Sequence, residues 1–206
     1  MKICLIRHGE TNWNLEKRIQ GQFDVPLNAN GTRQAVSMAG MASAHAFSAI
    51  YSSDLARAIE TARVLAKGRH TDIRIMPSLR ERHFGIFQGL KAEEGRAMHP
   101  EAYGKYIARD VEYDFETGES LDAFDKRVVE AMLDLRRVHE KETIAVVTHA
   151  GVLDIVYRRA TGRLLSAQRD FSIPNCVLNW FSIGEQGWHV ERWGHEYPAA
   201  EGGFVE

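Results

Sequence analysis

The stretch KICLIRHGET, residues 2–11, places an apolar run directly before Arg7, His8 and Gly9. The pattern recurs in TIAVVTHAG, residues 143–151, where an apolar run ends at His149. Both runs are typical of central parallel strands, which are covered on two faces and are therefore apolar throughout. In an open α/β sheet, the carboxyl ends of the strands form the binding crevice. The two stretches therefore predict a sheet that brings two histidines to one edge.

Strand and helix patterns alternate along the rest of the chain. Strands are expected over residues 2–6, 49–51, 72–76, 143–148, 177–183 and 188–193, and helices over 32–44, 54–67, 121–139 and 152–161. A turn over residues 28–31 is expected before the first helix, and Ser53 or Asp54 is expected to cap the second. This alternation predicts an α/β fold: a three-layer α/β/α sandwich with a mostly parallel central sheet.

Length and composition set further limits. A chain of 206 residues suits one domain over 1–206, in which the less regular residues 91–119 are expected to form an insertion or lid. The net charge of −2 provides no basic field for nucleic acid or an anionic membrane surface. Cys4 and Cys176 make no disulfide framework, and Cys4 is expected to be buried in its strand. With no targeting segment or membrane-spanning run, we expect a cytoplasmic protein.

Two arginines accompany the histidines at the predicted edge. Arg7 supplies a planar fork of donors that matches phosphate oxygens, and Gly9 allows close approach of the backbone to a ligand. Arg57 lies in the first turn of the helix after residues 49–51, where free N–H groups and the helix dipole favour an anion. The alternative for Arg57 is a solvent-exposed helix arginine.

Glu81 is the carboxylate expected at the same edge, because it follows the strand over residues 72–76. A carboxyl group beside a phosphate site can donate a proton to a leaving oxygen. A surface ion pair with Arg80 or Arg82 explains this residue equally well.

Other site types find no support in the sequence. The chain has nine histidines but no histidine or cysteine spacing typical of zinc, so we expect no metal. Neither a P-loop nor a glycine-rich dinucleotide motif follows the first strand, which counts against an unrelated nucleotide-binding protein. Histidines that fall on helices or in turns with polar neighbours are expected to be exposed: His45, His70, His99 and His139.

Several separated motifs together resemble the histidine phosphatase superfamily, in its phosphoglycerate mutase-like branch. The opening motif is RHGET with Trp13 and Asn14. The further blocks are QGQFDVPL (residues 20–27) with Gly31, Gln34 and Ala35; SSDLAR (52–57) with Glu60, Thr61 and Ala62; LRE (79–81) with Gly85 and Gly89; GES (118–120); and VTHAG (147–151). These blocks occur in the family's order and cover essentially the whole chain.

The resemblance implies a phosphoric monoester hydrolase of the histidine acid phosphatase type, without metal or other cofactor. It implies that His8 takes the phosphoryl group while Arg7, Arg57 and His149 hold its oxygens. Glu81 would protonate the leaving alcohol and then activate water. Asn14, Gln20 and Gly21 are assigned to substrate binding. The implied partner is a small phosphorylated substrate; no nucleic acid or membrane is expected, and a homodimer is left open.

Departures from the family pattern bear on the choice of substrate. FQG over residues 87–89 stands where the family usually has Trp-Glu-Gly, and ETGES over 116–120 replaces Pro-Gly-Gly-Glu-Ser. The interval between Glu81 and His149 is short, and residues 91–119 carry eight acids, an acidic cover that favours a phosphatase over a bisphosphoglycerate-dependent phosphoglycerate mutase. The mutase remains the first alternative, and a catalytically idle phosphate-binding interaction module is the second.

Overall fold

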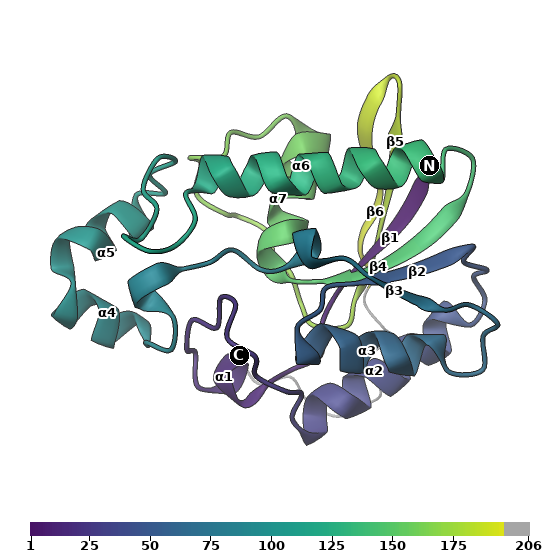
Figure 1. The fold of residues 1–206 in the computed structure, drawn as a ribbon, viewed down its shortest axis with the longest axis horizontal. Coiled ribbons are helices and arrows are strands. Elements are labelled where there is room, and N and C mark those ends of the chain that lie inside the picture. The colour runs from purple at the N-terminus through teal and green to yellow at the C-terminus, as the bar shows by residue number, and fades with distance from the viewer. Residues whose placement is uncertain (196–206) are drawn as a thin grey trace.

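The computed structural model describes residues 1–195, and Figure 1 shows how its helices and strands are arranged. The strands are β1 Lys2–Arg7, β2 Ala49–Ser52, β3 Ile73–Ile75, β4 Thr143–Thr148, β5 Leu178–Gly184 and β6 Gly187–His195. The helices are α1 Asn12–Leu15, α2 Ala29–Ala42, α3 Ala56–Ala66, α4 Ala92–Met98, α5 Pro100–Ile107, α6 Leu121–Val138 and α7 Ala150–Thr161. None of the helices in this described part is long and apolar enough to cross a membrane.

The sheet has the order β3-β2-β4-β1-β5-β6. The first four of these strands run parallel to one another, and β5 and β6 are antiparallel additions at one side. The prediction of a mostly parallel sheet is confirmed. It is also confirmed that the last two strands turn between Gly184 and Gly187.

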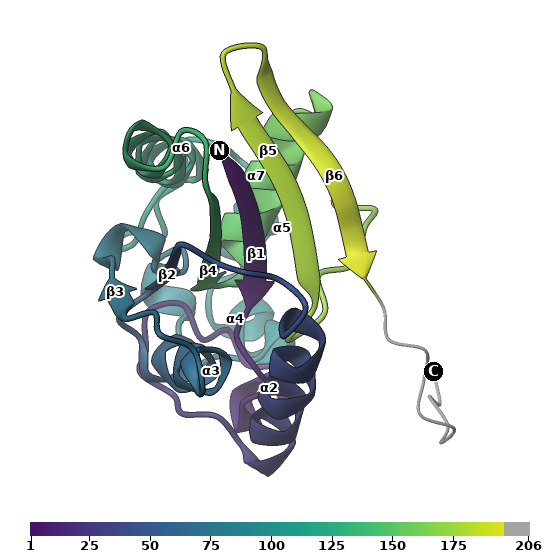
Figure 2. The ribbon, with the colours of Figure 1, turned by 90° about the vertical axis from the view of Figure 1, so that its right-hand side faces the viewer.

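Alternate residues of β1 enter different cores because successive side chains of a strand point to opposite faces. Ile3 and Leu5 pack with α6 and α7, whereas Cys4 and Ile6 pack with α2 and α3. All four side chains are fully buried. Figure 2 shows the two helix pairs on opposite sides of the sheet, which gives the three predicted layers.

Helices α2 and α3 begin at other residues than the sequence predicts, because their N-terminal caps were misassigned. Residues 28–31 are not a separate turn, because Asn28 accepts the Gly31 N–H at 2.7 Å and so caps α2, which already begins at Ala29. Helix α3 begins at Ala56 after Leu55, without a side-chain cap. Asp54 instead forms an ion pair with Arg80.

His139 is also placed wrongly by the sequence prediction, because it is buried rather than exposed. Its Nε2 lies 2.9 Å from the Tyr51 hydroxyl, and its Nδ1 bonds to the Glu142 carboxylate. This network joins the end of α6 to strand β2. A contact of this kind depends on tertiary packing, which the local sequence does not reveal.

Residues 91–119 contain two short helices, α4 and α5, that lie to one side of the sheet (Figure 1). Aromatic rings hold this segment together. The rings of Tyr106 and Phe115 lie within 6 Å of the buried Phe87 ring. The segment is therefore ordered by a small aromatic cluster that it shares with Phe87, although its sequence shows weak periodicity.

Candidate active site

The two predicted histidines meet because β1 and β4 are paired in register. Arg7 lies opposite Thr148, and the His8 N–H donates to the Thr148 carbonyl at 2.9 Å. The next residue after Thr148 is His149, whose ring centroid lies 5.2 Å from that of His8. The parallel strands thus place two imidazoles side by side at the carboxyl edge of the sheet.

His8 is held as a neutral imidazole with one unprotonated nitrogen. Its Nδ1 lies 2.7 Å from the Gly9 carbonyl, which can only accept, so Nδ1 carries the proton. Its Nε2 receives the Arg57 Nε–H at 3.3 Å and is therefore unprotonated. Burial lowers the pKa of His8 well below 6.5, and Arg57 and Arg7 lower it further. The ring therefore presents a lone pair on Nε2.

Arg57 is fully buried, so the alternative of a solvent-exposed arginine is wrong. Its two terminal nitrogens donate to the carbonyls of Gly21 and Phe23, both at 2.7 Å. Burial is the main reason that its pKa is lowered to about 10, which still leaves it charged at neutral pH. The first turn of α3 and the loop after α1 thus fix a cation against His8.

Arg7 and His149 each keep a buried polar atom that has no hydrogen-bond partner within residues 1–195. Arg7 donates to the Ile173 carbonyl at 2.7 Å, but its Nε is unpaired among the described residues. His149 Nε2 lies 2.9 Å from the Ser53 hydroxyl, and its Nδ1 is likewise unpaired in this part of the chain. Buried polar atoms are normally satisfied, so these two atoms beside His8 leave room for a bound partner, such as an anion.

The Glu81 carboxylate is held by backbone groups rather than by arginines. Oε1 accepts the Arg82 N–H at 2.8 Å and Oε2 accepts the Gly151 N–H at 3.1 Å. The Arg80 guanidinium pairs with Asp54, and the Arg82 guanidinium donates to backbone carbonyls. The alternative of a surface ion pair for Glu81 is therefore wrong, and its carboxylate lines the cavity beside the start of α7.

Asn14, Gln20 and Gly21 line the same cavity from the loop around α1. The side-chain oxygens of Asn14 and Gln20 accept from the backbone N–H and the hydroxyl of Thr11, respectively. This arrangement leaves their amide NH2 groups as the donors. Gly21 has a φ of +51°, and a Cβ there would lie 2.0 Å from Gln88 Oε1, so only glycine fits while its carbonyl holds Arg57.

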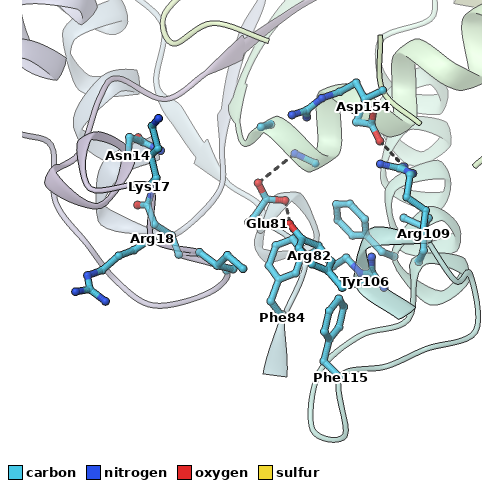
Figure 3. A pocket seen from close by; sticks show the side chains of 18 of the residues that line it. Asn14, Lys17, Arg18, Glu81, Arg82, Phe84, Tyr106, Arg109, Phe115 and Asp154 are labelled. Carbon is cyan, nitrogen blue, oxygen red and sulfur yellow. Dashed lines mark hydrogen bonds and ion pairs between the residues drawn. The ribbon is translucent and has the colours of Figure 1, made fainter. Parts of the chain in front are cut away.

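The cavity holds about 580 Å³ and is lined by more cations than acids. Figure 3 shows Glu81 between Asn14, Lys17 and Arg18 on one side and Tyr106, Arg109 and Phe115 of residues 91–119 on the other. The lining cations are Arg7, Lys17, Arg18, Arg57, Arg82, Arg109 and Arg169, and the lining acids are Glu81, Asp110 and Asp154. Of the eight acids in residues 91–119, only Asp110 lines the cavity, so the expectation of an acidic cover is wrong.

Arg82 is a site residue whose orientation the sequence did not reveal. It is only 8% exposed, and its guanidinium lies 4.6 Å from the centre of the Phe115 ring. Burial is the main cause that lowers its pKa to about 10. The neighbouring acid, Glu119, is bound to Arg127, so within residues 1–195 Arg82 has no carboxylate in an ion pair. Its position directly after Glu81 is the one sequence signal that could have indicated it.

The described residues include no cluster of three or more His, Cys, Asp or Glu side chains that could hold a metal ion. The expectation that the enzyme needs no metal stays a prediction.

Comparisons with known proteins agree with this geometry. A family model described as the histidine phosphatase superfamily (branch 1) matches residues 3–196. Phosphoglycerate mutase-like protein 4 of Arabidopsis thaliana is 38% identical over 209 residues, covering 100% of this chain and 90% of the relative. The metal-independent phosphoserine phosphatase of the same organism is 36% identical over 208 residues, covering 100% of this chain and 86% of the relative.

A solved structure gives the same result for the fold. A mutant phosphoserine phosphatase from Entamoeba histolytica, in complex with phosphoserine, superimposes with a TM-score of 0.84 at 28% sequence identity. The match covers 94% of this chain and 96% of that one. With the family model spanning almost its full length, the chain belongs to the histidine phosphatase superfamily.

Proposed function

We propose that this protein hydrolyses small phosphomonoesters through a phosphohistidine on His8. The observation that carries the proposal is the unprotonated Nε2 of a buried histidine, which faces a cavity lined by cations. A neutral imidazole is a competent nucleophile, whereas an imidazolium has no lone pair to offer. Phosphoryl transfer depends mainly on positioning and charge stabilisation, and this site supplies both.

In the first step, His8 Nε2 forms a bond to phosphorus while the bond from phosphorus to the ester oxygen breaks. Arg7, Arg57 and His149 hold the three non-bridging oxygens. The unpaired Arg7 Nε and His149 Nδ1 are the donors that gain partners. A protonated Glu81 gives its proton to the departing alkoxide, which leaves as an alcohol.

In the second step, water replaces the alcohol in the cavity. The Glu81 carboxylate accepts a proton from this water as the oxygen attacks phosphorus, and the bond from phosphorus to Nε2 breaks. Inorganic phosphate leaves, and His8 returns to its neutral state. This chemistry is that of a histidine acid phosphatase, and we place the substrates among small cytoplasmic phosphomonoesters.

The side of the cavity formed by Arg82 and residues 91–119 favours a leaving group that carries its own negative charge. Arg82 faces this side without a carboxylate partner in the described chain, and a carboxylate is a strong partner for a buried guanidinium. Two of the other cations are already neutralised, because Arg109 pairs with Asp154 and Arg18 pairs with Glu16 and Glu94. We therefore propose a phosphorylated hydroxy or amino acid, such as phosphoserine, as the substrate class.

The same Arg82 favours phosphoglycerate mutase activity as the second candidate, because a mutase must grip a substrate with two anionic groups. A panel of phosphoserine, 3-phosphoglycerate, sugar phosphates and nitrophenyl phosphate, with released phosphate as the readout, tests the first proposal. Isomer exchange is followed in the same reactions with 2,3-bisphosphoglycerate added. We expect phosphate release to exceed exchange. Exchange that is much faster than release would favour the mutase, and neither activity would favour the interaction module.

A further inference from the structure

The proposed chemistry depends on which nitrogen of His8 carries the proton. In a neutral imidazole, the hydrogen bond made by one nitrogen decides the protonation of the other. For His8 that bond is made by Nδ1 to the carbonyl of Gly9, the very next residue. The Gly9 carbonyl belongs to the following peptide, Gly9–Glu10, so the His8–Gly9 peptide before it fixes where this acceptor begins, while the Arg57 Nε–H favours the same tautomer from the Nε2 side.

Two side chains from distant parts of the chain hold the two ends of this one peptide. Asn175 donates its side-chain amide to the His8 carbonyl at 2.7 Å. The Gly9 N–H donates to the Thr61 hydroxyl oxygen at 3.0 Å. A peptide unit fixed at both its oxygen and its nitrogen cannot rotate without breaking one of these bonds.

Thr61 also connects this peptide to the phosphate-binding arginine. Its side chain is fully buried in α3, and its hydroxyl donates to the Arg57 carbonyl at 2.8 Å. The hydroxyl therefore donates to one site residue and accepts from another. A valine at this position would have nearly the same shape but could do neither.

The segment around Asn175 is bound tightly to the end of β1. The Ile173 carbonyl accepts from the Arg7 guanidinium at 2.7 Å, and the Cys176 N–H donates to the Arg7 carbonyl at 2.9 Å. Cys176 has a φ of +55°, in the left-handed region that residues other than glycine rarely adopt. Strained residues persist only where the surroundings enforce them, so residues 173–176 are held in one conformation.

We propose that Thr61 and Asn175 are positioning residues that clamp the His8–Gly9 peptide and so fix Gly9, whose carbonyl receives the Nδ1 proton, which together with Arg57 keeps the lone pair on Nε2. This inference rests on the proposed function for its kinetic consequence, but the tautomer is a property of the substrate-free protein. Neither residue touches the reacting atoms. Both act through the backbone that orients the nucleophile.

The first experiment measures the tautomer directly in the substrate-free protein. In protein labelled with ¹⁵N, an NMR spectrum that correlates ring nitrogens with carbon-bound ring protons distinguishes the two tautomers. The His8 signals are assigned by their loss in His8→Ala. We expect protonated Nδ1 in the unaltered protein and in Thr61→Ser, and a mixture of tautomers in Thr61→Val and Asn175→Ala.

The second experiment measures kcat and KM for the best substrate of the panel. A misplaced nucleophile lowers kcat by about 10- to 100-fold, whereas KM stays within about threefold because the arginines that bind phosphate remain. Asn179→Ala is the matched control. Asn179 is buried and donates its amide to the Leu5 carbonyl of the same strand, away from the site. We expect that variant to lose stability but to keep its kcat and its His8 tautomer.

The outcomes separate the two proposals. Protonated Nδ1 together with unchanged kcat in both Thr61→Val and Asn175→Ala would overturn the positioning role. Equal losses of kcat in Thr61→Ser or Asn179→Ala would also overturn it, because those losses would reflect stability alone. If the unaltered protein released no phosphate but the tautomer shifted as described, the proposed function would fail while the positioning role held.

Discussion

Gly151→Ala should disable Glu81 without removing any functional group. A Cβ at position 151 would lie 2.1 Å from Glu81 Oε1 and 3.0 Å from the Phe124 ring. Ordinary van der Waals contact begins at 3.4 Å, so the first distance is 1.3 Å too short. The ring is buried and packed, which leaves the carboxylate as the group that must move. Glu81 would therefore shift by about 1 Å and weaken its bond to the Gly151 N–H.

A displacement of about 1 Å in a catalytic group can cost on the order of 100-fold in rate. The loss depends on the leaving group, because only a poor leaving group needs the proton from Glu81. We expect kcat for an alkyl phosphate such as phosphoserine to fall by about 100-fold. Nitrophenyl phosphate should lose about threefold or less, since nitrophenolate departs without protonation.

Gly40→Ala is the control for this prediction. Gly40 also lies within a helix, α2, but nothing lies within 4 Å of an added Cβ. That variant should keep full activity and gain roughly 0.5–1 kcal/mol in the free energy of unfolding. Equal losses on both substrates in Gly151→Ala would refute the assignment of Glu81 as the proton donor, and so would undiminished turnover of phosphoserine.

Three further predictions concern charge and metal. Burial and the neighbouring arginines lower the pKa of His8 and His149 well below 6.5, so the unfolded chain takes up protons below that pH while the folded protein does not. The free energy of unfolding should therefore fall as pH drops from about 7 to 5, and denaturation of the double variant His8→Gln/His149→Gln should show a flatter dependence. Arg82→Met should lower kcat/KM for phosphoserine by about 10- to 100-fold, which corresponds to one charged hydrogen bond. In that variant kcat/KM for nitrophenyl phosphate should stay unchanged, and Arg82→Lys should recover part of the loss for phosphoserine. A uniform loss on both substrates would contradict recognition of a second anion. Activity should survive dialysis against a chelator, and restoration of a lost activity by zinc or magnesium would contradict the metal-free mechanism.

The sequence predicted that His8, His149 and Arg57 meet at the carboxyl edge of the sheet, because these residues lie on or directly after regular elements. His8 and His149 each follow a buried parallel strand, and the pairing of β1 with β4 brings them together. Arg57 lies in the first turn of α3, where the position of a side chain follows from the helix itself. In these cases the secondary structure fixes the place of the functional group.

The side of the site formed by Glu81, Arg82 and residues 91–119 could not be predicted in the same way. Glu81 and Arg82 follow a short 3₁₀ turn, Pro77–Leu79, and extended backbone, where no period tells which way a side chain points. The acids of residues 91–119 suggested an acidic cavity, but composition does not reveal which side chains face inward. Arg82 turns inward because Phe115 and the carbonyls of Tyr113 and Glu119 receive its guanidinium. Those contacts join segments that are distant in the sequence.

The most direct test of the phosphohistidine mechanism is the capture of phosphate on His8. The protein is mixed briefly with ³²P-labelled phosphomonoester, quenched in alkali, and analysed by peptide mass spectrometry. We predict an alkali-stable, acid-labile phosphoryl group on His8 that is absent from His8→Ala, a variant that should also lack turnover. Full turnover by His8→Ala, or a phosphoryl group on any other residue, would contradict this mechanism.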